Sequence, residues 1–494
     1  MTNSNDDLSA RETARLVSSR QLSPVETVKA AIERISRRNP SLNAVVFTDF
    51  DGALARARAL EGRIMRGDPV GRMAGVPTLM KDLFDFRPGW PTSFGGIAAL
   101  KNFVPDHWST YPRRVEEQDA ILIGKTNSPV LGFCGATDNP LFGATGNPFD
   151  PTRNSGGSSG GSTAAVADGM VPVAGATDGG GSIRIPSSWS GTAGFQPSPG
   201  RVPMVMRPNA FGRAPLYLYE GPVTRSVGDL ALAMNVLAGH DPADPFSSVD
   251  SVDFDRALDT PIKGRRIGFT PDFGIFPVEP NVASVIADAV RAFEDAGAIV
   301  EEIDLKLPYD QKQLSDLWCR LICITSHGFM EGLKATGIDL IRDHRDQLPE
   351  QLVEFIQKVG AMSANEFEAD QIMRTGVYDT LNTALATYDF IVSPTTAALP
   401  TKNLSNGLTT GPQEINGIAV DPRIGWCMTY MTNMSGHPAA SLPAGLADGL
   451  PVGLQIIGRR NADFEVMAAC AAFERSRPWQ DIYAIPAARP LDGR

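Results

Sequence analysis

Two segments rich in serine and glycine contain the residue types that acyl-transfer chemistry requires. Residues 153–169 read RNSGGSSGGSTAAVADG, and residues 176–191 read ATDGGGSIRIPSSWSG. A serine hydroxyl is a weak nucleophile until a neighbouring base takes its proton. Successive backbone N–H groups in a turn of consecutive glycines can face one developing negative charge. Ser182 directly follows Gly179, Gly180 and Gly181, at the end of such a glycine turn.

Lys81 is a candidate for the base. It follows the apolar run 76–80, VPTLM, which predicts that its ammonium is partly buried. Desolvation lowers the pKa of a lysine and makes a neutral amine available. The alternative is a structural lysine at a strand end that pairs with Asp82, and the spacing alone favours this alternative.

A different mechanism would use a histidine as the base. Gly156, Ser158 and Gly160 match G-x-S-x-G, the nucleophile elbow of α/β-hydrolases, which needs an acid and a histidine downstream. The histidines available there are His240, His327, His344 and His437. A flexible linker is disfavoured because an Ala-rich helix and a buried strand follow at once. A phosphate loop would need a lysine before its serine or threonine.

The elements expected around these residues alternate between helix and strand. A helix begins after Ser23, which is expected to form a capping box with Glu26, has Pro24 as its first residue and ends before Pro40. After Ser158, a helix of about nine residues covers ~14 Å. The strand that returns from it covers ~20 Å in about six residues. This path can bring Ser158 and Ser182 together.

A second strand-helix-strand unit is expected in the later part of the chain. A strand near Ile267, a helix from about Pro280, a stop at Gly297 and a strand over 298–303 predict an α/β architecture with a mixed sheet. Residues 240–255, rich in Pro, Asp and Ser, are expected to form a long surface connection.

Composition limits the class of protein. The chain has 494 residues, 42% of them hydrophobic, and a net charge of -11, which argues against nucleic acid or anionic lipid as a partner. Residues 1–16 are polar without an apolar leader region, and no run approaches ~18 apolar residues. Five scattered cysteines suit reduced thiols, so we expect a cytoplasmic protein. Cys319 and Cys323 have no zinc-spaced partners, so no metal is expected.

The ordered set of motifs resembles the amidase signature family. GVPTLMKDLF, NSGGSSGGS and TDGGGSIRIPSSWSG are similar to its three hallmarks, and YDFIVSPTTAALP with TNMSGHPAASLPAGLADGLPVGLQIIG to its C-terminal part. The resemblance implies one amidase signature domain over 1–494, with a central mixed, twisted β-sheet covered by helices on both faces. Within it we expect an N-terminal helical region (about 5–65), a signature core (about 66–240) and a C-terminal α/β part (about 260–490).

The resemblance also implies a Ser–cis-Ser–Lys triad. Lys81 matches the base, Ser158 the serine after a cis peptide bond with Gly157, and Ser182 the nucleophile. The G-x-S-x-G match is then coincidental. The backbone N–H groups of Gly179, Gly180 and Gly181, with that of Ser182, match the oxyanion hole.

Further matches concern residues that hold the glycine loop in place and residues that line the substrate pocket. Asp178 and Arg184 match residues that hold the loop, although Arg184 could also be a surface residue. Gly132, through its carbonyl, and Phe133 match the substrate pocket. Trp189 and the apolar residues of 204–221 are further candidates for contact with substrate. Two positions depart from many members: Val130, where an acidic residue is common, and Gly179, where a bulkier one is common.

Three functions follow from the resemblance. The first is a hydrolase for a small, fairly apolar amide, anilide or carbamate, with an acyl-enzyme intermediate and no cofactor. The second is the glutamine-hydrolysing subunit of a tRNA-dependent amidotransferase. The third, a scaffold without activity, is disfavoured because all three triad positions are filled. For the first, we expect a small-molecule amide as partner, no nucleic acid and no membrane, with a homodimer left open.

Overall fold

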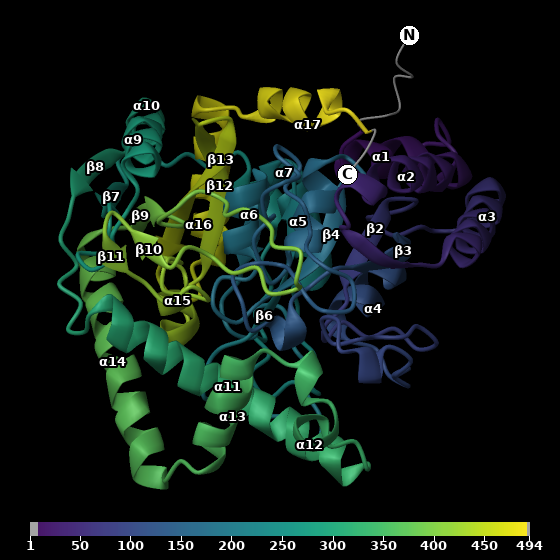
Figure 1. Cartoon of the computed structure of the whole chain (residues 1–494). Helices are drawn as coiled ribbons and strands as arrows, with labels where there is room; N and C mark the ends of the chain where they lie inside the picture. Colours follow the sequence, from purple (N-terminus) through teal and green to yellow (C-terminus); the bar gives the residue numbers. More distant parts are fainter. Residues whose placement is uncertain (1–7, 492–494) are drawn as a thin grey trace.

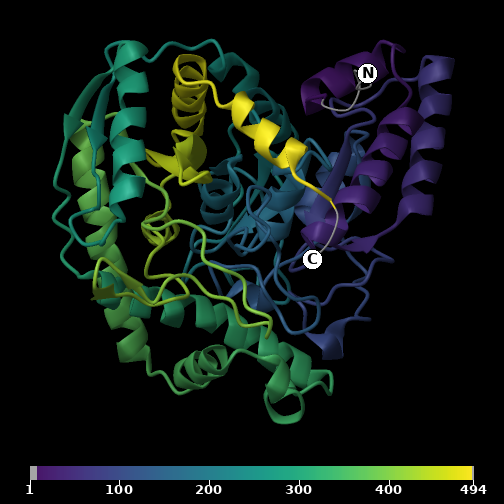
Figure 2. The same cartoon turned by 45° about the horizontal axis from the view of Figure 1, so that its top comes forward.

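A mixed eleven-stranded β-sheet runs through the computed structural model, which describes residues 8–491 (Figures 1 and 2). Its strands, in spatial order, are β1 (Val45–Thr48), β3 (Ile121–Thr126), β2 (Pro77–Lys81), β4 (Val173–Asp178), β6 (Tyr219–Thr224), β5 (Ala193–Gln196), β12 (Ala439–Ala447), β13 (Leu450–Gly458), β9 (Phe390–Pro394), β7 (Arg266–Phe269) and β8 (Ile299–Glu302). A separate hairpin consists of β10 (Glu414–Ile415) and β11 (Ile418–Ala419).

The sheet combines parallel and antiparallel pairs, as predicted. β2 lies parallel to β3 and β4, and β7 lies parallel to β8 and β9. Between these groups the pairs from β4 through β6, β5, β12 and β13 to β9 are antiparallel. The C-terminal strands β12 and β13 thus lie between β5 and β9 and join the two halves of the chain in one sheet.

Helices flank this sheet, which confirms the predicted fold class. They are α1 (Ala10–Ser18), α2 (Pro24–Arg38), α3 (Phe50–Arg66), α4 (Thr110–Glu117), α5 (Gly160–Ala167), α6 (Arg184–Ser190), α7 (Val227–Leu237), α8 (Phe254–Ala257), α9 (Pro280–Ala289), α10 (Arg291–Asp295), α11 (Gln311–Ala335), α12 (Leu340–Asp343), α13 (Glu350–Gly360), α14 (Ala364–Thr387), α15 (Tyr430–Ser435), α16 (Asp463–Ser476) and α17 (Ala484–Ala488). In Figure 1, α1–α3 lie at one end of the sheet and α11–α14 below it. Among the helices of residues 8–491, none is both long and apolar enough to span a membrane.

Local sequence signals account for several of these boundaries. The capping box of Ser23 and Glu26 is present at the start of α2, with Pro24 as the first helical residue. The predicted strand-helix-strand unit is β7, α9 and β8, and Gly297 adopts a φ of 83° before β8. That φ favours glycine because it lacks a Cβ atom.

The predicted N-terminal helical region is not purely helical. Its first residues, 5–7, lie outside the described part of the chain. Between α2 and α3 it contributes β1, which pairs antiparallel with β3. Arg38, at the end of α2, forms a buried ion pair with Asp168 at 2.7 Å, and Asp168 also binds Arg489 at 3.1 Å. The C-terminal segment with α17 is thereby fastened to α2 and α5.

The connection over 240–255 is irregular up to the start of α8 at Phe254, as expected. It is not confined to the surface, because Asp244 is buried and binds Arg213 at 2.6 Å. The prediction of a surface connection is therefore wrong at Asp244, where an ion pair anchors the segment.

Candidate active site

Lys81 lies at the end of β2 and is fully buried. Its Nζ donates to Ser158 Oγ at 2.7 Å and to Thr177 Oγ1 at 2.9 Å. Its backbone N–H donates to Oδ2 of the buried Asp85 at 2.9 Å. The apolar run that forms β2 therefore delivers the amine to a serine hydroxyl inside the protein.

Burial lowers the pKa of Lys81 from 10.5 to about 7, although the negative charges of Asp85 and Asp178 act in the opposite direction. A substantial neutral fraction of this amine is thus present near neutral pH. Asp82 does not pair with Lys81. Its carboxylate binds Lys125 at 3.0 Å, so the alternative of a Lys81–Asp82 pair is wrong.

Ser158 follows a cis peptide bond with Gly157, as the resemblance implied, and lies just before α5. A Cβ atom on Gly157 would lie 2.8 Å from the carbonyl oxygen of Cys134, so only glycine allows this approach. The backbone N–H of Ser159 donates to the carbonyl oxygen of Ser182 at 3.3 Å. The two serine segments are therefore adjacent.

The glycine loop, residues 178–182, connects β4 to the turn before α6. Gly181 has a φ of 118°, which favours glycine, and a Cβ atom there would overlap Thr429 Oγ1. Gly179 and Gly180 do not have a positive φ. A Cβ on Gly180 would overlap Trp318 Nε1, and one on Gly179 would lie 2.9 Å from Leu218 Cδ2. At these two positions the absence of a Cβ atom allows the side chains of Trp318 and Leu218 to approach the backbone closely.

Asp178 and Arg184 form a fully buried ion pair at 3.0 Å behind this loop. Burial opposes ionisation of Asp178, yet the Arg184 charge and the hydrogen bonds hold the pKa of its carboxyl below the usual value. Arg184 also donates to Gln455, Thr432 and Asn433 and to the Thr429 carbonyl. The surface alternative for Arg184 is therefore wrong.

Asp178 has a second contact with consequences for the site. Its Oδ1 accepts the backbone N–H of Gly181 at 2.6 Å. Of the three glycines predicted for the oxyanion hole, Gly181 thus has its N–H group engaged by a carboxylate. This arrangement favours the other N–H groups of the loop as donors to a substrate oxygen.

The predicted substrate residues have different surroundings. A Cβ on Gly132 would lie 3.2 Å from Ser158 Oγ, which places Gly132 beside the triad candidates. Phe133 is buried and stacks on Trp318, with ring centroids 5.7 Å apart. Trp189 is buried against Trp426, and its Nε1 donates to the carbonyl of Ala398, so it is a core residue. Val130 packs in the same apolar cluster as Phe133.

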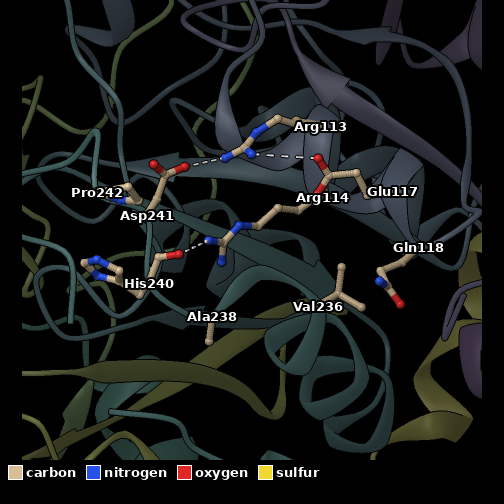
Figure 3. Close-up of a pocket in the computed structure, with 9 residues that line it drawn as sticks. All are labelled: Arg113, Arg114, Glu117, Gln118, Val236, Ala238, His240, Asp241 and Pro242. Carbon is tan, nitrogen blue, oxygen red and sulfur yellow. Dashed lines mark hydrogen bonds and ion pairs between the residues drawn. The ribbon is translucent and has the colours of Figure 1, made fainter. Parts of the chain in front are cut away.

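The four histidines of the alternative mechanism lie in four different surroundings. His437 is buried and its Nδ1 lies 2.9 Å from Ser435 Oγ. His240 lines a cleft between α4 and the segment after α7, and its carbonyl accepts from Arg114 (Figure 3). His327 lies beside Gly360, and His344 follows α12. Lys81, not a histidine, donates to Ser158, so the elbow mechanism finds no support here.

The cleft of Figure 3 is lined by two arginines, two carboxylates and several neutral residues. Arg113 pairs with Asp241 at 2.5 Å, and Arg114 donates to main-chain carbonyls including that of Gly239. Within residues 8–491, no group of three or more His, Cys, Asp and Glu side chains is arranged to hold a metal ion. The buried lysine and the two serine loops therefore remain the chemically distinctive site.

The profile of the Amidase family matches residues 26–467. The chain belongs to the amidase family. It is an enzyme that acts on carbon–nitrogen bonds, as expected of an amidase.

Similar amidase-family proteins extend over nearly the whole chain. An acylamidase of Rhodococcus erythropolis is 35% identical over 482 residues, covering 96% of each chain. A glutamyl-tRNA(Gln) amidotransferase subunit of Moorella thermoacetica is 33% identical, covering 95% of this chain and 96% of the relative. The crystal structure of a bacterial aryl acylamidase of the amidase signature family has a TM-score of 0.96 and 54% identity. It covers 98% of this chain and 99% of that one.

Three residues of this amidase's site were not found by sequence reasoning. Thr177, which accepts from Lys81, stands directly before Asp178 in a quoted motif, so its position offered a signal. Trp318 and Thr429, which contact the glycine loop, lie outside every motif that was assigned a role. Only the tertiary structure brings them to the site.

Proposed function

We propose that this amidase hydrolyses a small, fairly apolar amide, anilide or carbamate through Lys81, Ser158 and Ser182. The observation that carries the proposal is the 2.7 Å hydrogen bond from the buried Lys81 amine to Ser158. The next residue, Ser159, donates its backbone N–H to the carbonyl oxygen of Ser182. The similarity to an acylamidase and to an aryl acylamidase supports this substrate class. The apolar surroundings of the site, with Phe133, Trp318 and Leu218, suit an apolar substrate.

In the proposed mechanism Ser182 attacks the amide carbonyl carbon. Ser158 takes the proton of Ser182 and passes its own to neutral Lys81. Backbone N–H groups of the glycine loop stabilise the oxyanion, and loss of one such donor typically costs ~3 kcal/mol. The carbon–nitrogen bond then breaks as Ser158 returns a proton to the leaving nitrogen, and the acyl group stays on Ser182. Water releases the acid by the same relay.

A second candidate function is the glutamine-hydrolysing subunit of a tRNA-dependent amidotransferase. The observation that favours it is the 33% identity to such subunits over nearly the whole chain. In that case the substrate would be glutamine, and activity would depend on a partner.

The first proposal includes no partner beyond the substrate. It also places the protein in the cytoplasm, in keeping with its five free cysteines.

We expect the purified protein, without any partner, to hydrolyse apolar anilides, amides or carbamates faster than glutamine. Release of aniline, amine or ammonia from a substrate panel measures this directly. Glutaminase activity that appears only with an added tRNA-binding partner would instead support the second function.

Chelators should leave the rate unchanged, because the proposed relay uses only side chains and backbone. A loss of activity on chelation that one metal restores would refute the relay.

The pH profile should report Lys81. Because only the neutral amine accepts a proton and its pKa is lowered to about 7, kcat/KM should rise through about pH 7 and level off at alkaline pH. Steady-state rates on one anilide between pH 5 and 10 test this. A rate that stays flat across this range would show that the protonation state of Lys81 does not control the rate.

A further inference from the structure

Helix α11 places a tryptophan against the glycine loop. Trp318 is buried, and its indole Nε1 donates to the carbonyl oxygen of Gly179 at 2.8 Å. Its ring stacks on Phe133, with 15° between the ring planes. Phe133 follows Gly132, which lies beside Ser158. Trp318 therefore connects the glycine loop with the segment that borders the proposed triad.

This hydrogen bond fixes the direction of one peptide group. In a trans peptide the carbonyl oxygen and the following N–H point to opposite sides. Because the Gly179 carbonyl faces the indole, the N–H of Gly180 points away from it. The absence of a side chain on Gly180 allows this close approach, since a Cβ atom there would overlap the indole nitrogen.

The next peptide group of the loop, between Gly180 and Gly181, is held at both its carbonyl and its N–H. Thr429 Oγ1 donates to the Gly180 carbonyl at 2.6 Å, and Asp178 accepts the N–H of Gly181. Three consecutive glycines have little conformational preference of their own. The orientation of their N–H groups therefore depends on these contacts, and that of Gly180 depends on Trp318.

We propose that Trp318 is a positioning residue for the oxyanion hole, which holds the Gly179–Gly180 peptide so that the Gly180 N–H faces the substrate oxygen. This inference rests on the amide hydrolysis proposed above. A donor held in place stabilises the negative charge that develops in the transition state more than the neutral ground-state amide. Loss of the Trp318 bond therefore lowers kcat and leaves KM nearly unchanged.

The variant Trp318→Phe removes the N–H donor and keeps a ring for stacking on Phe133. Removal of a direct oxyanion donor typically costs on the order of 10²- to 10³-fold in kcat. For the positioning bond we expect a decrease of about 10- to 100-fold, with KM within about twofold of wild type. A trifluoromethyl ketone analogue, which forms a tetrahedral serine adduct, should bind more weakly by a similar factor.

A matched control is Trp479→Phe. Trp479 is also buried, and its Nε1 donates to the carbonyl oxygen of Arg225 at 3.0 Å, away from the glycine loop. This variant loses the same kind of bond, and its kcat should stay near that of wild type. Replacement of Trp318 by β-benzothienylalanine, which has the indole shape but no N–H, covers the case that Trp318→Phe does not fold.

Parallel assays of Ser182→Ala distinguish a failure of the proposed function from a failure of the positioning role of Trp318. If Ser182→Ala still hydrolyses the amide, the proposed function fails. If Ser182→Ala is inactive while folded Trp318 variants keep wild-type kcat and analogue affinity, only the positioning role is refuted. An increase in KM alone would identify Trp318 as a substrate contact and would also refute that role.

Discussion

Ser182→Ala should lower kcat by on the order of 10⁴-fold or more, because the proposed covalent step has no other nucleophile. The serine side chain is small and largely buried, so removal of one oxygen leaves the fold intact. Initial rates on the best substrate of the panel measure the loss, and thermal unfolding measures the stability. Hydrolysis at more than a few per cent of the wild-type rate would refute the assignment.

The control for this variant is Ser326→Ala. Ser326 is as exposed as Ser182, at 8%, and its hydroxyl donates to the carbonyl of Ile322 within α11. Its removal changes buried polarity to a similar extent without touching the proposed chemistry. We therefore expect wild-type turnover from Ser326→Ala and a similar thermal stability for both variants.

Replacement of Lys81 should produce the second large effect. Lys81→Arg keeps a positive charge but introduces a group that stays protonated in proteins, so it has no lone pair for the proton relayed by Ser158. General base catalysis typically contributes 10²- to 10⁴-fold. We expect a loss of about 10³-fold or more for Lys81→Arg, and a comparable loss for the neutral, nearly isosteric Lys81→Met.

Four histidine variants test the competing mechanism: His240→Ala, His327→Ala, His344→Ala and His437→Ala. All four should retain most of the activity if their folds are intact. An active Lys81→Arg together with one inactive, folded histidine variant would instead support a serine–histidine enzyme. The acidic limb of its pH profile would then lie near ~6.5 unless the pKa of that histidine is shifted.

Local sequence patterns predicted the elements that carry the candidate triad. The apolar run before Lys81 forms β2, and the helix and strand after Ser158 are α5 and β4. The capping box at Ser23 likewise sets the start of α2. These features depend on neighbours within a few residues, so the sequence contains nearly all the information that they require.

The contacts between distant segments could not be predicted in this way. Trp318 reaches Gly179, and Thr429 reaches Gly180, across long stretches of chain whose folded path no local pattern specifies. Trp189 shows the converse error. It lies seven residues after Ser182, yet its ring packs against Trp426 in the core. Proximity along the chain is a poor guide to which face of a helix meets the site.

The position of β12 and β13 between β5 and β9 determines when the enzyme can become active during its synthesis. A ribosome that has passed residue 240 has already supplied Lys81, Ser158 and Ser182. The nascent polypeptide still lacks β12 to cover the edge of β5, and it lacks Thr429 and Gln455 to hold Arg184 and the glycine loop. An uncovered strand edge invites pairing with other chains. We therefore expect catalysis to begin only after β12 and β13 have been synthesised, so that a chain terminated before them contains Lys81, Ser158 and Ser182 but has no amidase activity.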